Sequence, residues 1–401
     1  MTRWSDGAVV AGRWSGWVRR AALVLALVAC ADGGERQAGA QAAARRAAPP
    51  RAADSLTARE FGALVARLSE PGGFFDTDNL ISNERSYLHV IGALERRPVR
   101  GGAYVGVGPD QNFSYIARVR PSAAYVIDIR RDNLVQHLFF KALFAGARNR
   151  AEYLALMLGR TPPPRVGDWG ARSLAQIAAY LDSAPVHPAA DSLTAALLAS
   201  ARQGGVPLTA ADERSFAKIH RSFIQDGLAL QFTSFGRAPR PFYPTLRQLL
   251  LERDLEDREA SYLAREEDFQ FVKGLQRRNL VVPVVGNLAG AHALAEIGRV
   301  TRERGERVSA FYTSNVEDYL MRDGSFERFA RTVAGLPRDT RSVIIRSAFG
   351  RGPAGPPAPP VRGYYSAQLL QPIDVFVSLH ERGELRSYSD VVTKGSLPLT
   401  R

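Results

Sequence analysis

The sequence predicts an α/β protein built on a mostly parallel, seven-stranded sheet with helices on both faces. From residue 103 onward, short apolar runs recur without the polar alternation of half-exposed strands. Longer segments with helical periodicity separate most of these runs. Strands that are apolar throughout are buried on both faces, and this is typical of a parallel sheet covered by helices.

The elements follow from this alternation. The runs expected as strands are 103–107, 123–127, 228–232, 280–285, 308–312, 342–345 and 375–379. The segments expected as helices between them are 111–119, 131–146, 244–276, 290–304 and 324–335. We also expect a helical insertion at about 155–226 and a loop rich in Pro and Gly at 349–363.

The folded part is expected to begin near residue 55 and to continue to residue 401. Thr57 and Glu60 have the spacing of a capping box, and Leu56 and Phe61 flank it as a hydrophobic staple would. A helix should therefore follow directly. A second amphipathic helix is expected from about residue 83 to residue 96.

The N-terminus has the pattern of an export signal. Arginines precede a nine-residue apolar run at 21–29, which is too short to span a bilayer and suits a signal peptide. Residues 27–30 end on Cys30, which is the one cysteine of the chain, and they resemble the lipobox of bacterial lipoproteins. The alternative is a stray cysteine in a hydrophobic leader.

The resemblance to lipoproteins implies that residues 1–29 are removed and that Cys30 is lipidated. The protein would then be held to the bacterial cell envelope through Cys30, and Ala31 after it favours the outer membrane, facing the periplasm. Residues 30–54 have low complexity and lack large apolar side chains, so we expect a disordered tether.

Charge and histidine spacing limit the function classes. The chain has 53 Lys and Arg against 40 Asp and Glu, with no basic stripe interleaved with aromatic side chains. We therefore expect no nucleic-acid partner, and we interpret the charge as solvated surface or attraction to anionic lipid. The six histidines show no paired ligand spacing, so we expect no metal site. The oligomeric state does not follow from the sequence.

The segment 103–133 carries the strongest indication of a ligand site. Gly106 and Gly108 follow an apolar run and precede a helical segment, where Asn112 is suited to cap the helix. Asp128 ends the next apolar run, 20 residues after Gly108, at the position of an acid that binds a ribose diol. The alternative is a strand-to-helix turn whose glycines serve packing alone.

The chain resembles the class I S-adenosylmethionine-dependent methyltransferases. The resemblance rests on "GVGPDQNFSYIA" and "IDIRRDN", and with "SEPGGFF", "NERSYL", "VPVVGNLAG" and "FYTSNVEDYL" it extends to an uncharacterised bacterial family assigned to that fold. It implies a Rossmann-like sheet that binds S-adenosylmethionine or a related nucleoside. Gly106, Gly108 and Asp128 match the family's cofactor-binding positions. Asp110, Asn112 and Asn287 are further candidates for cofactor binding, because they lie in the turns that follow the expected strands.

The chain departs from the methyltransferase pattern at two places. Asp110 stands where a third glycine is usual. The Asn-Pro-Pro-aromatic motif that usually follows the fourth strand is absent, and residues 286–290 are expected in its place. Both departures put catalysis in doubt.

Three further segments could contribute to the crevice. Asn287 and Ser314 follow apolar runs, where they either bind a ligand or cap helices. The polar segment 74–87 either closes over the crevice as a lid, with Glu84 or Asp78 as a general base, or packs on the core with Asn83 as a cap.

Two functions from different classes remain. The first is a lipid-anchored envelope protein that binds a small molecule in a methyltransferase-like crevice. The alternative is an active methyltransferase acting on a small-molecule or protein acceptor. S-adenosylmethionine is made in the cytoplasm, so an export signal favours the first.

Overall fold

The computed structural model describes residues 55–237, 240–349 and 361–400. All of them belong to one compact unit, Ala48–Arg401. The signal peptide expected at 1–29, Cys30, the tether at 30–54 and most of the loop expected at 349–363 lie outside the described residues.

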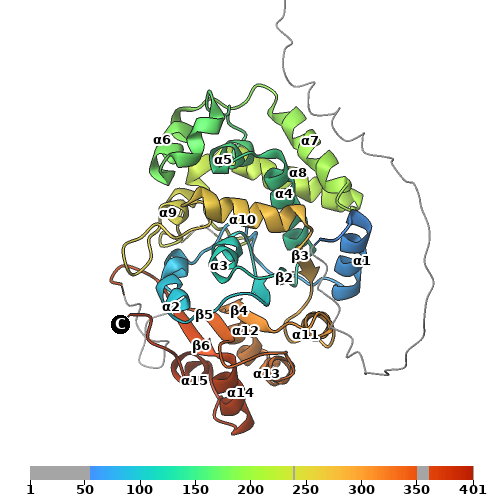
Figure 1. The fold of residues 1–401 in the computed structure, drawn as a ribbon, viewed down its shortest axis with the longest axis vertical. Coiled ribbons are helices and arrows are strands. Elements are labelled where there is room, and N and C mark those ends of the chain that lie inside the picture. Colours follow the sequence, from blue (N-terminus) through green and yellow to red (C-terminus); the bar gives the residue numbers. More distant parts are fainter. Residues whose placement is uncertain (1–54, 238–239, 350–360, 401) are drawn as a thin grey trace, which may run out of the picture. The chain divides into compact units, whose positions relative to one another are not determined.

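The described chain forms one six-stranded sheet in the order β3-β2-β1-β4-β5-β6 (Figure 1). Strands β1 to β5 pair in parallel, and β6 runs antiparallel to β5. The strands are β1 (Ala103–Val107), β2 (Ala123–Asp128), β3 (Val281–Val285), β4 (Val308–Ser314), β5 (Val343–Phe349) and β6 (Ser366–Pro372). The α/β class with a mostly parallel sheet is confirmed.

The expected number of seven strands is wrong for two local reasons. Segment 228–232 joins no sheet, because a short 3-10 helix, η3 (Gly227–Ala229), leads into a single bridge between Gln231 and Thr245. Segment 375–379 lies inside helix α14 (Ile373–Glu381), where Asp374 in the first turn suits the helix N-terminus.

The last strand of the sheet is β6, which ends before the segment 375–379 that was expected to form the last strand. Its sequence, Ser-Ala-Gln-Leu-Leu-Gln-Pro, is not an apolar run, yet all but its last residue are buried. Gln368 donates to the side chains of Glu84 and Ser347, and Gln371 accepts from Arg346 and donates to Lys394 O. Because these buried glutamines are polar, hydrophobicity did not reveal the strand.

Helices cover both faces of the sheet (Figure 1). On one face, α3 (Gln111–Val119) contacts β1 and β4, and α4 (Arg131–Gly146) contacts β2 and β3. On the other face, α11 (Ala293–Glu303) contacts β2, and α12 (Val316–Arg322) contacts β4. The remaining core helices are α1 (Ala58–Leu68), α2 (Ile91–Arg96), α5 (Arg150–Met157), α9 (Leu246–Leu250), α10 (Glu266–Arg277), α13 (Phe326–Ala334) and α15 (Tyr388–Thr393).

Local sequence signals predict the first helix correctly, but two of the expected helices are each divided into two shorter elements. The capping box of α1 is present, because Thr57 Oγ1 accepts the Glu60 amide at 3.2 Å and Glu60 accepts the Thr57 amide at 2.8 Å. The helix expected at 83–96 is divided into a 3-10 helix, η1 (Arg85–Leu88), and α2. The long helix expected at 244–276 is divided into α9 and α10.

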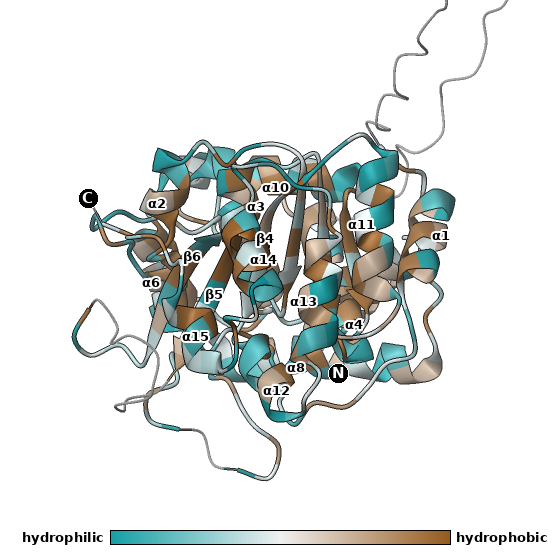
Figure 2. Cartoon of the chain, turned by 90° about the horizontal axis from the view of Figure 1, so that it is seen from below, coloured by the Kyte–Doolittle hydropathy of each residue, from teal (hydrophilic) through white to brown (hydrophobic). Residues whose placement is uncertain are grey.

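The segment expected as an insertion, 155–226, is mainly helical. It contains a 3-10 helix, η2 (Val166–Ala171), and α6 (Leu174–Ser183), α7 (Ala190–Arg202) and α8 (Ala210–Asp226). Helices α7 and α8 both pack against α4. Figure 2 shows hydrophobic colour on much of the sheet, hydrophilic colour on parts of β5 and β6, and mixed or hydrophilic colour on the outer helix surfaces. Apart from these polar parts, this is expected for a sheet buried between helical layers.

Candidate functional site

The glycine turn between β1 and α3 is built around Asn112. Gly108 has a φ of +82°, which disfavours a side chain there. A Cβ atom on Gly106 would lie 2.0 Å from Asn112 Oδ1. Gly106 is therefore required by the packing of Asn112 within the turn, independently of any ligand.

Asn112 directs all its hydrogen bonds into the protein. Its Nδ2 donates to the carbonyl oxygens of Val107 and Pro109, at 2.8 and 2.7 Å, and its Oδ1 accepts from the Tyr104 hydroxyl at 2.8 Å. The side chain is fully buried. Asn112, expected as a cofactor-binding residue, thus fixes the shape of the turn.

Asp110 lies at the N-terminus of α3 and makes no side-chain cap. Its carboxylate accepts a hydrogen bond from the Tyr262 hydroxyl at 3.2 Å. Burial raises the pKa of Asp110 to about 6. The carboxyl group that replaces the usual third glycine therefore stays mostly charged at neutral pH and is neutralised as the pH falls below about 6.

Asp128 lies at the end of β2, where the sequence places an acid for a ribose diol. Arg130 occupies both of its carboxylate oxygens, with Nε 3.0 Å from Oδ1 and Nη2 2.9 Å from Oδ2. The same arginine donates from Nη1 to the carbonyl oxygens of Thr77 and Asp78. A diol that binds Asp128 therefore competes with Arg130 for the carboxylate.

The segment that precedes η1 lies across the carboxyl ends of β2 and β3. The amide of Gly73 donates to Ile129 O at 2.7 Å, and the amide of Glu70 donates to Val285 O at 2.9 Å. The carboxylate of Asp78 accepts from the Thr233 amide at 3.2 Å and from the Thr233 hydroxyl. Asp78, expected as a possible base, therefore ties this segment to residue 233.

Three buried side chains near the glycine turn have polar atoms with no partner among the described residues. These atoms are Gln111 Oε1, both amide atoms of Asn133, and His137 Nδ1. We call Gln111, Asn133 and His137 the turn cluster. Each is at most 6% exposed.

Two members of the turn cluster, His137 and Gln111, lie beside Gly108. His137 Nε2 lies 2.9 Å from Gly108 O, and a Cβ on Gly108 would lie 3.5 Å from Gln111 Nε2. Asn133 and His137 are one turn apart on α4, so their side chains share a helix face. Burial lowers the pKa of His137 to about 4, which keeps its ring neutral.

The turn cluster is not among the site residues expected from the sequence. A signal was available, because Asn133, Gln136 and His137 interrupt a largely apolar helix on one face. Gln136 is satisfied, since its Nε2 donates to Leu80 O at 2.6 Å. The sequence could not distinguish it from its unpaired neighbours.

Glu84 is a buried carboxylate at the carboxyl ends of β4 and β5. It accepts hydrogen bonds from Tyr312 at 2.5 Å, from Gln368 at 3.3 Å, and from the hydroxyls of Ser314 and Ser347. No cation is among these partners, and burial raises the pKa of Glu84. We call Glu84 and its four donors the Glu84 cluster.

The Glu84 cluster is connected to the turn cluster. Gln111 Nε2 donates to the Tyr312 hydroxyl at 3.3 Å, and that hydroxyl donates to Glu84. The donors of Glu84 come from β4, β5 and β6, which are far from residue 84 in the sequence. Ser314 adopts a left-handed φ of +53°, which is unusual for a residue other than glycine.

Asn287 lies in the turn after β3, where its Oδ1 accepts from the Ala289 amide at 2.9 Å. Its own amide donates to Glu70 at 2.7 Å. The expectation that residues 286–290 follow the fourth strand is wrong. Because 228–232 is not a strand, residues 286–290 follow β3, the third strand along the chain. The residues that follow β4 are Asn315, Val316 and Glu317.

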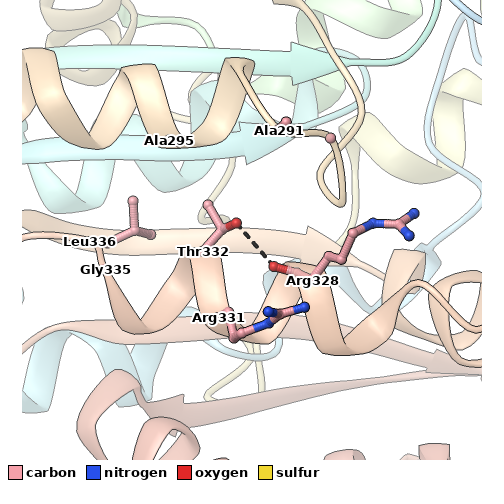
Figure 3. Close-up of a pocket in the computed structure, with 8 residues that line it drawn as sticks. Ala291, Ala295, Arg328, Arg331, Thr332, Gly335 and Leu336 are labelled. Atoms are coloured by element: carbon pink, nitrogen blue, oxygen red, sulfur yellow. Dashed lines mark hydrogen bonds between the residues drawn. The ribbon is translucent and has the colours of Figure 1, made fainter.

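A surface hollow of about 420 Å³ lies between the start of α11 and α13 (Figure 3). Small side chains line most of it, with Arg328 and Arg331 among the lining residues. Arg328 Nε donates to Ala289 O at 3.2 Å. Asn287 does not line this hollow, so its position lends no support to a ligand there.

In 55–237, 240–349 and 361–400, no three His, Cys, Asp or Glu side chains gather closely enough to hold a metal ion. The absence of a metal site stays a prediction. Across these same ranges, none of the helices has the length and apolar character needed to cross a membrane.

Comparison with known protein families gives a match to part of the chain. The family described as a domain of unknown function (DUF7790) matches residues 80–161 and 209–394, which are more than half of the chain. The residues between the two matched ranges include η2, α6 and α7. No curated protein matches the chain. The chain therefore belongs to the DUF7790 family of domains of unknown function.

Proposed function

We propose that this protein is a lipid-anchored cell-envelope protein that binds a small nucleoside-type molecule in a methyltransferase-like crevice. The observation that carries the proposal is the turn cluster. A buried polar atom without a partner costs about 1–3 kcal/mol, so several such atoms around one turn are explained best by a ligand that pairs with them.

The strand order supports a ligand at this place. In open α/β sheets, ligands bind outside the carboxyl ends of the strands, where the strand order reverses. In the order β3-β2-β1-β4-β5, the reversal lies between β1 and β4. Gly108 and Gln111 follow β1, and Tyr312 lies on β4, so both sides of the reversal carry polar groups.

The same order resembles that of the class I S-adenosylmethionine-dependent methyltransferases, including an antiparallel strand beside β5. A nucleoside fits part of the residues present. Asn133, Gln111 and His137 offer unpaired donors and acceptors, and Asp128 offers a carboxylate for a diol that competes with Arg130. The bound molecule would be S-adenosylmethionine or a related nucleoside.

Binding can be tested with the full chain, purified in detergent. Native mass spectrometry would identify what co-purifies, and calorimetry would measure the affinity for S-adenosylmethionine, S-adenosylhomocysteine and adenosine. We expect at least one to bind, and Asn133→Leu to weaken it by about tenfold or more. Asp132→Asn is the control, because Asp132 is an exposed neighbour that pairs with Ser215.

The proposal fails if none of the three nucleosides binds and no small molecule co-purifies. It also fails if Asn133→Leu binds as tightly as the unaltered chain. Circular dichroism and the thermal transition show independently whether Asn133→Leu is correctly folded.

The anchor is tested separately. We propose that Cys30 carries the lipid, on the basis of the export pattern in residues 1–30. Cys30→Ser should move the chain from the membrane fraction to the soluble fraction and abolish incorporation of labelled fatty acid. Unchanged membrane association without label incorporation would contradict lipidation.

The alternative, an active methyltransferase, is favoured by the Glu84 cluster. A buried carboxylate of raised pKa beside the crevice is suited to take a proton from an acceptor. S-adenosylmethionine, when bound, would supply the methyl group. Glu84→Gln should then abolish formation of S-adenosylhomocysteine in the presence of envelope extract while nucleoside binding persists. No turnover by the unaltered chain would exclude this alternative for the acceptors in that extract.

A further inference from the structure

Two adjoining hollows form a groove beside β6, outside the site described above. Their volumes are about 520 and 180 Å³, and they share Arg85, Gln248 and Tyr364 as lining residues. We call them together the edge groove. The side chains that matter for its chemistry are Arg85, His89, Arg247, Arg253, Tyr364 and Tyr365.

His89 contributes an unsatisfied polar atom to this groove. It lines the larger hollow, it is 2% exposed, and its Nδ1 has no partner among the described residues. Its ring lies 4.7 Å from the ring of Tyr364. A buried, unpaired imidazole nitrogen is expected where a ligand completes the hydrogen bonding.

Most of the acidic side chains that line the groove accept hydrogen bonds from other residues of the chain. Glu252 accepts from Arg85 Nε at 2.8 Å, from the Tyr364 hydroxyl at 2.6 Å and from the Arg253 amide at 3.1 Å. Asp254 is fully buried and accepts from Arg258 and from the Glu256 amide. Asp257, beside Arg253 at 3.5 Å, is the exposed acid of the lining.

The cations of the groove remain accessible. The side chains of Arg85, Arg247 and Arg253 are 44%, 38% and 48% exposed. Arg247 also pairs with Asp182, which does not line the groove. The terminal amino groups of Arg85 have no hydrogen-bond partner in the described chain, and its guanidinium lies 4.9 Å from the centre of the Tyr364 ring.

We propose that the edge groove binds an organic anion in which a flat ring carries a phosphate or carboxylate group. The anionic group would meet Arg85 and Arg253, the ring would lie against Tyr364, and His89 would complete the hydrogen bonding. Guanidinium groups bind phosphate and carboxylate by paired hydrogen bonds, and aromatic side chains accept flat rings. The volume of the larger hollow is in the range of small-molecule sites.

The edge groove is independent of the nucleoside site. Its lining residues include none of the turn cluster. Glu84 directly precedes Arg85 in the sequence but does not line the groove. Binding in the groove can therefore succeed or fail whatever the outcome at the glycine turn.

The test titrates the full chain in detergent with phenyl phosphate, benzoate, inorganic phosphate and phenol, by calorimetry and by NMR of imidazole nitrogens. We expect phenyl phosphate or benzoate to bind, phenol not to bind, and inorganic phosphate to bind less tightly than phenyl phosphate. Tighter binding of phenyl phosphate than of benzoate would indicate a phosphate ligand, and the reverse order would indicate a carboxylate ligand. The His89 imidazole signal should shift on binding.

Variants locate the binding. Arg85→Gln should weaken the ring anion by about tenfold, since a charged hydrogen-bonding partner is lost. Arg253→Gln, at a more exposed position, should weaken it by about threefold or more and tests the groove if Arg85→Gln is unstable. Arg221→Gln, on the exposed side of α8, is the control and should bind normally.

Two outcomes would overturn the proposal. In the first, neither phenyl phosphate nor benzoate binds to the unaltered chain at millimolar concentration. In the second, a ring anion binds but Arg85→Gln and Arg253→Gln bind it as tightly as Arg221→Gln, with no shift of the His89 signal.

Discussion

Arg130 engages both carboxylate oxygens of Asp128 and at the same time holds two carbonyl oxygens of the segment above it. Two of these contacts join the end of β2 to Thr77 and Asp78. The acid that would bind a ribose diol is therefore paired with an internal cation. Ligand binding at Asp128 must compete with this pair.

Arg130→Gln tests the competition. It should release Asp128 and raise the affinity for adenosine by about fivefold or more, and it should destabilise the chain by about 1–3 kcal/mol because charged hydrogen bonds are lost. Calorimetry and urea unfolding measure the two effects. Arg131→Gln is the matched control, since the neighbouring Arg131 pairs with Asp212 instead. Equal adenosine affinity in both variants would contradict competition at Asp128.

Asn133 and Gln136 form a matched pair on α4 with opposite expected results. Asn133→Leu should stabilise the free chain by about 1 kcal/mol, because it removes a buried amide with no partner. Gln136→Leu should destabilise it by about 1–3 kcal/mol, because Leu80 O loses its donor. Urea unfolding of ligand-free protein measures both. Destabilisation by Asn133→Leu would indicate that its amide has partners.

Gly106 and Gly108 should respond differently to alanine. Gly106→Ala places a Cβ 2.0 Å from Asn112 Oδ1, so we expect a loss of more than about 2 kcal/mol. For Gly108→Ala the nearest atoms would lie 3.5 Å away, and only the positive φ costs energy, about 1 kcal/mol. Thermal and urea unfolding compare them.

A double variant identifies the cause of the Gly106 effect. Adding Asn112→Ala to Gly106→Ala removes the nearest clashing atom and leaves the Tyr104 hydroxyl and Cε1, 2.6 and 2.8 Å from the added Cβ. The two changes together should therefore cost less than the sum of the separate changes. Strict additivity, or an equal cost for both glycines, would show that Asn112 does not determine the need for Gly106.

Asp110→Asn should alter the pH dependence of stability. Because burial raises the pKa of Asp110 from 3.8 to about 6, the folded state favours the protonated acid. Stability from this group is present below pH 3.8 and is lost as the pH rises through 6. The variant should therefore gain stability relative to the unaltered chain between pH 4 and pH 7, by about 2 kcal/mol.

Urea unfolding at pH 4, 5, 6 and 7 measures this difference. Asp132→Asn serves as the control, because Asp132 is an exposed acid on α4. If the difference for Asp110→Asn changes no more with pH than that for Asp132→Asn, the carboxyl group of Asp110 titrates normally in the folded protein.

Local patterns were sufficient for most of the sheet. Strands β1 to β5 lie on runs of apolar and β-branched residues, and the capping box of α1 was readable from Thr57 and Glu60. The failures occurred where long-range contacts decide the state. Segment 375–379 has strand-like side chains but forms a helix, and β6 is polar enough to be overlooked because its glutamines bind other buried groups.

The sequence by itself determined the α/β class, the position of the glycine turn and the placement of Asp128 at the end of β2, because these depend on residues close together in the chain. Only the tertiary structure decided which polar groups are satisfied. Arg130 reaches Asp128 and the segment above it, the donors of Glu84 come from three distant strands, and Asn133 is buried without a partner. Hydrogen-bond satisfaction depends on atoms that meet through folding, so residue spacing cannot reveal it.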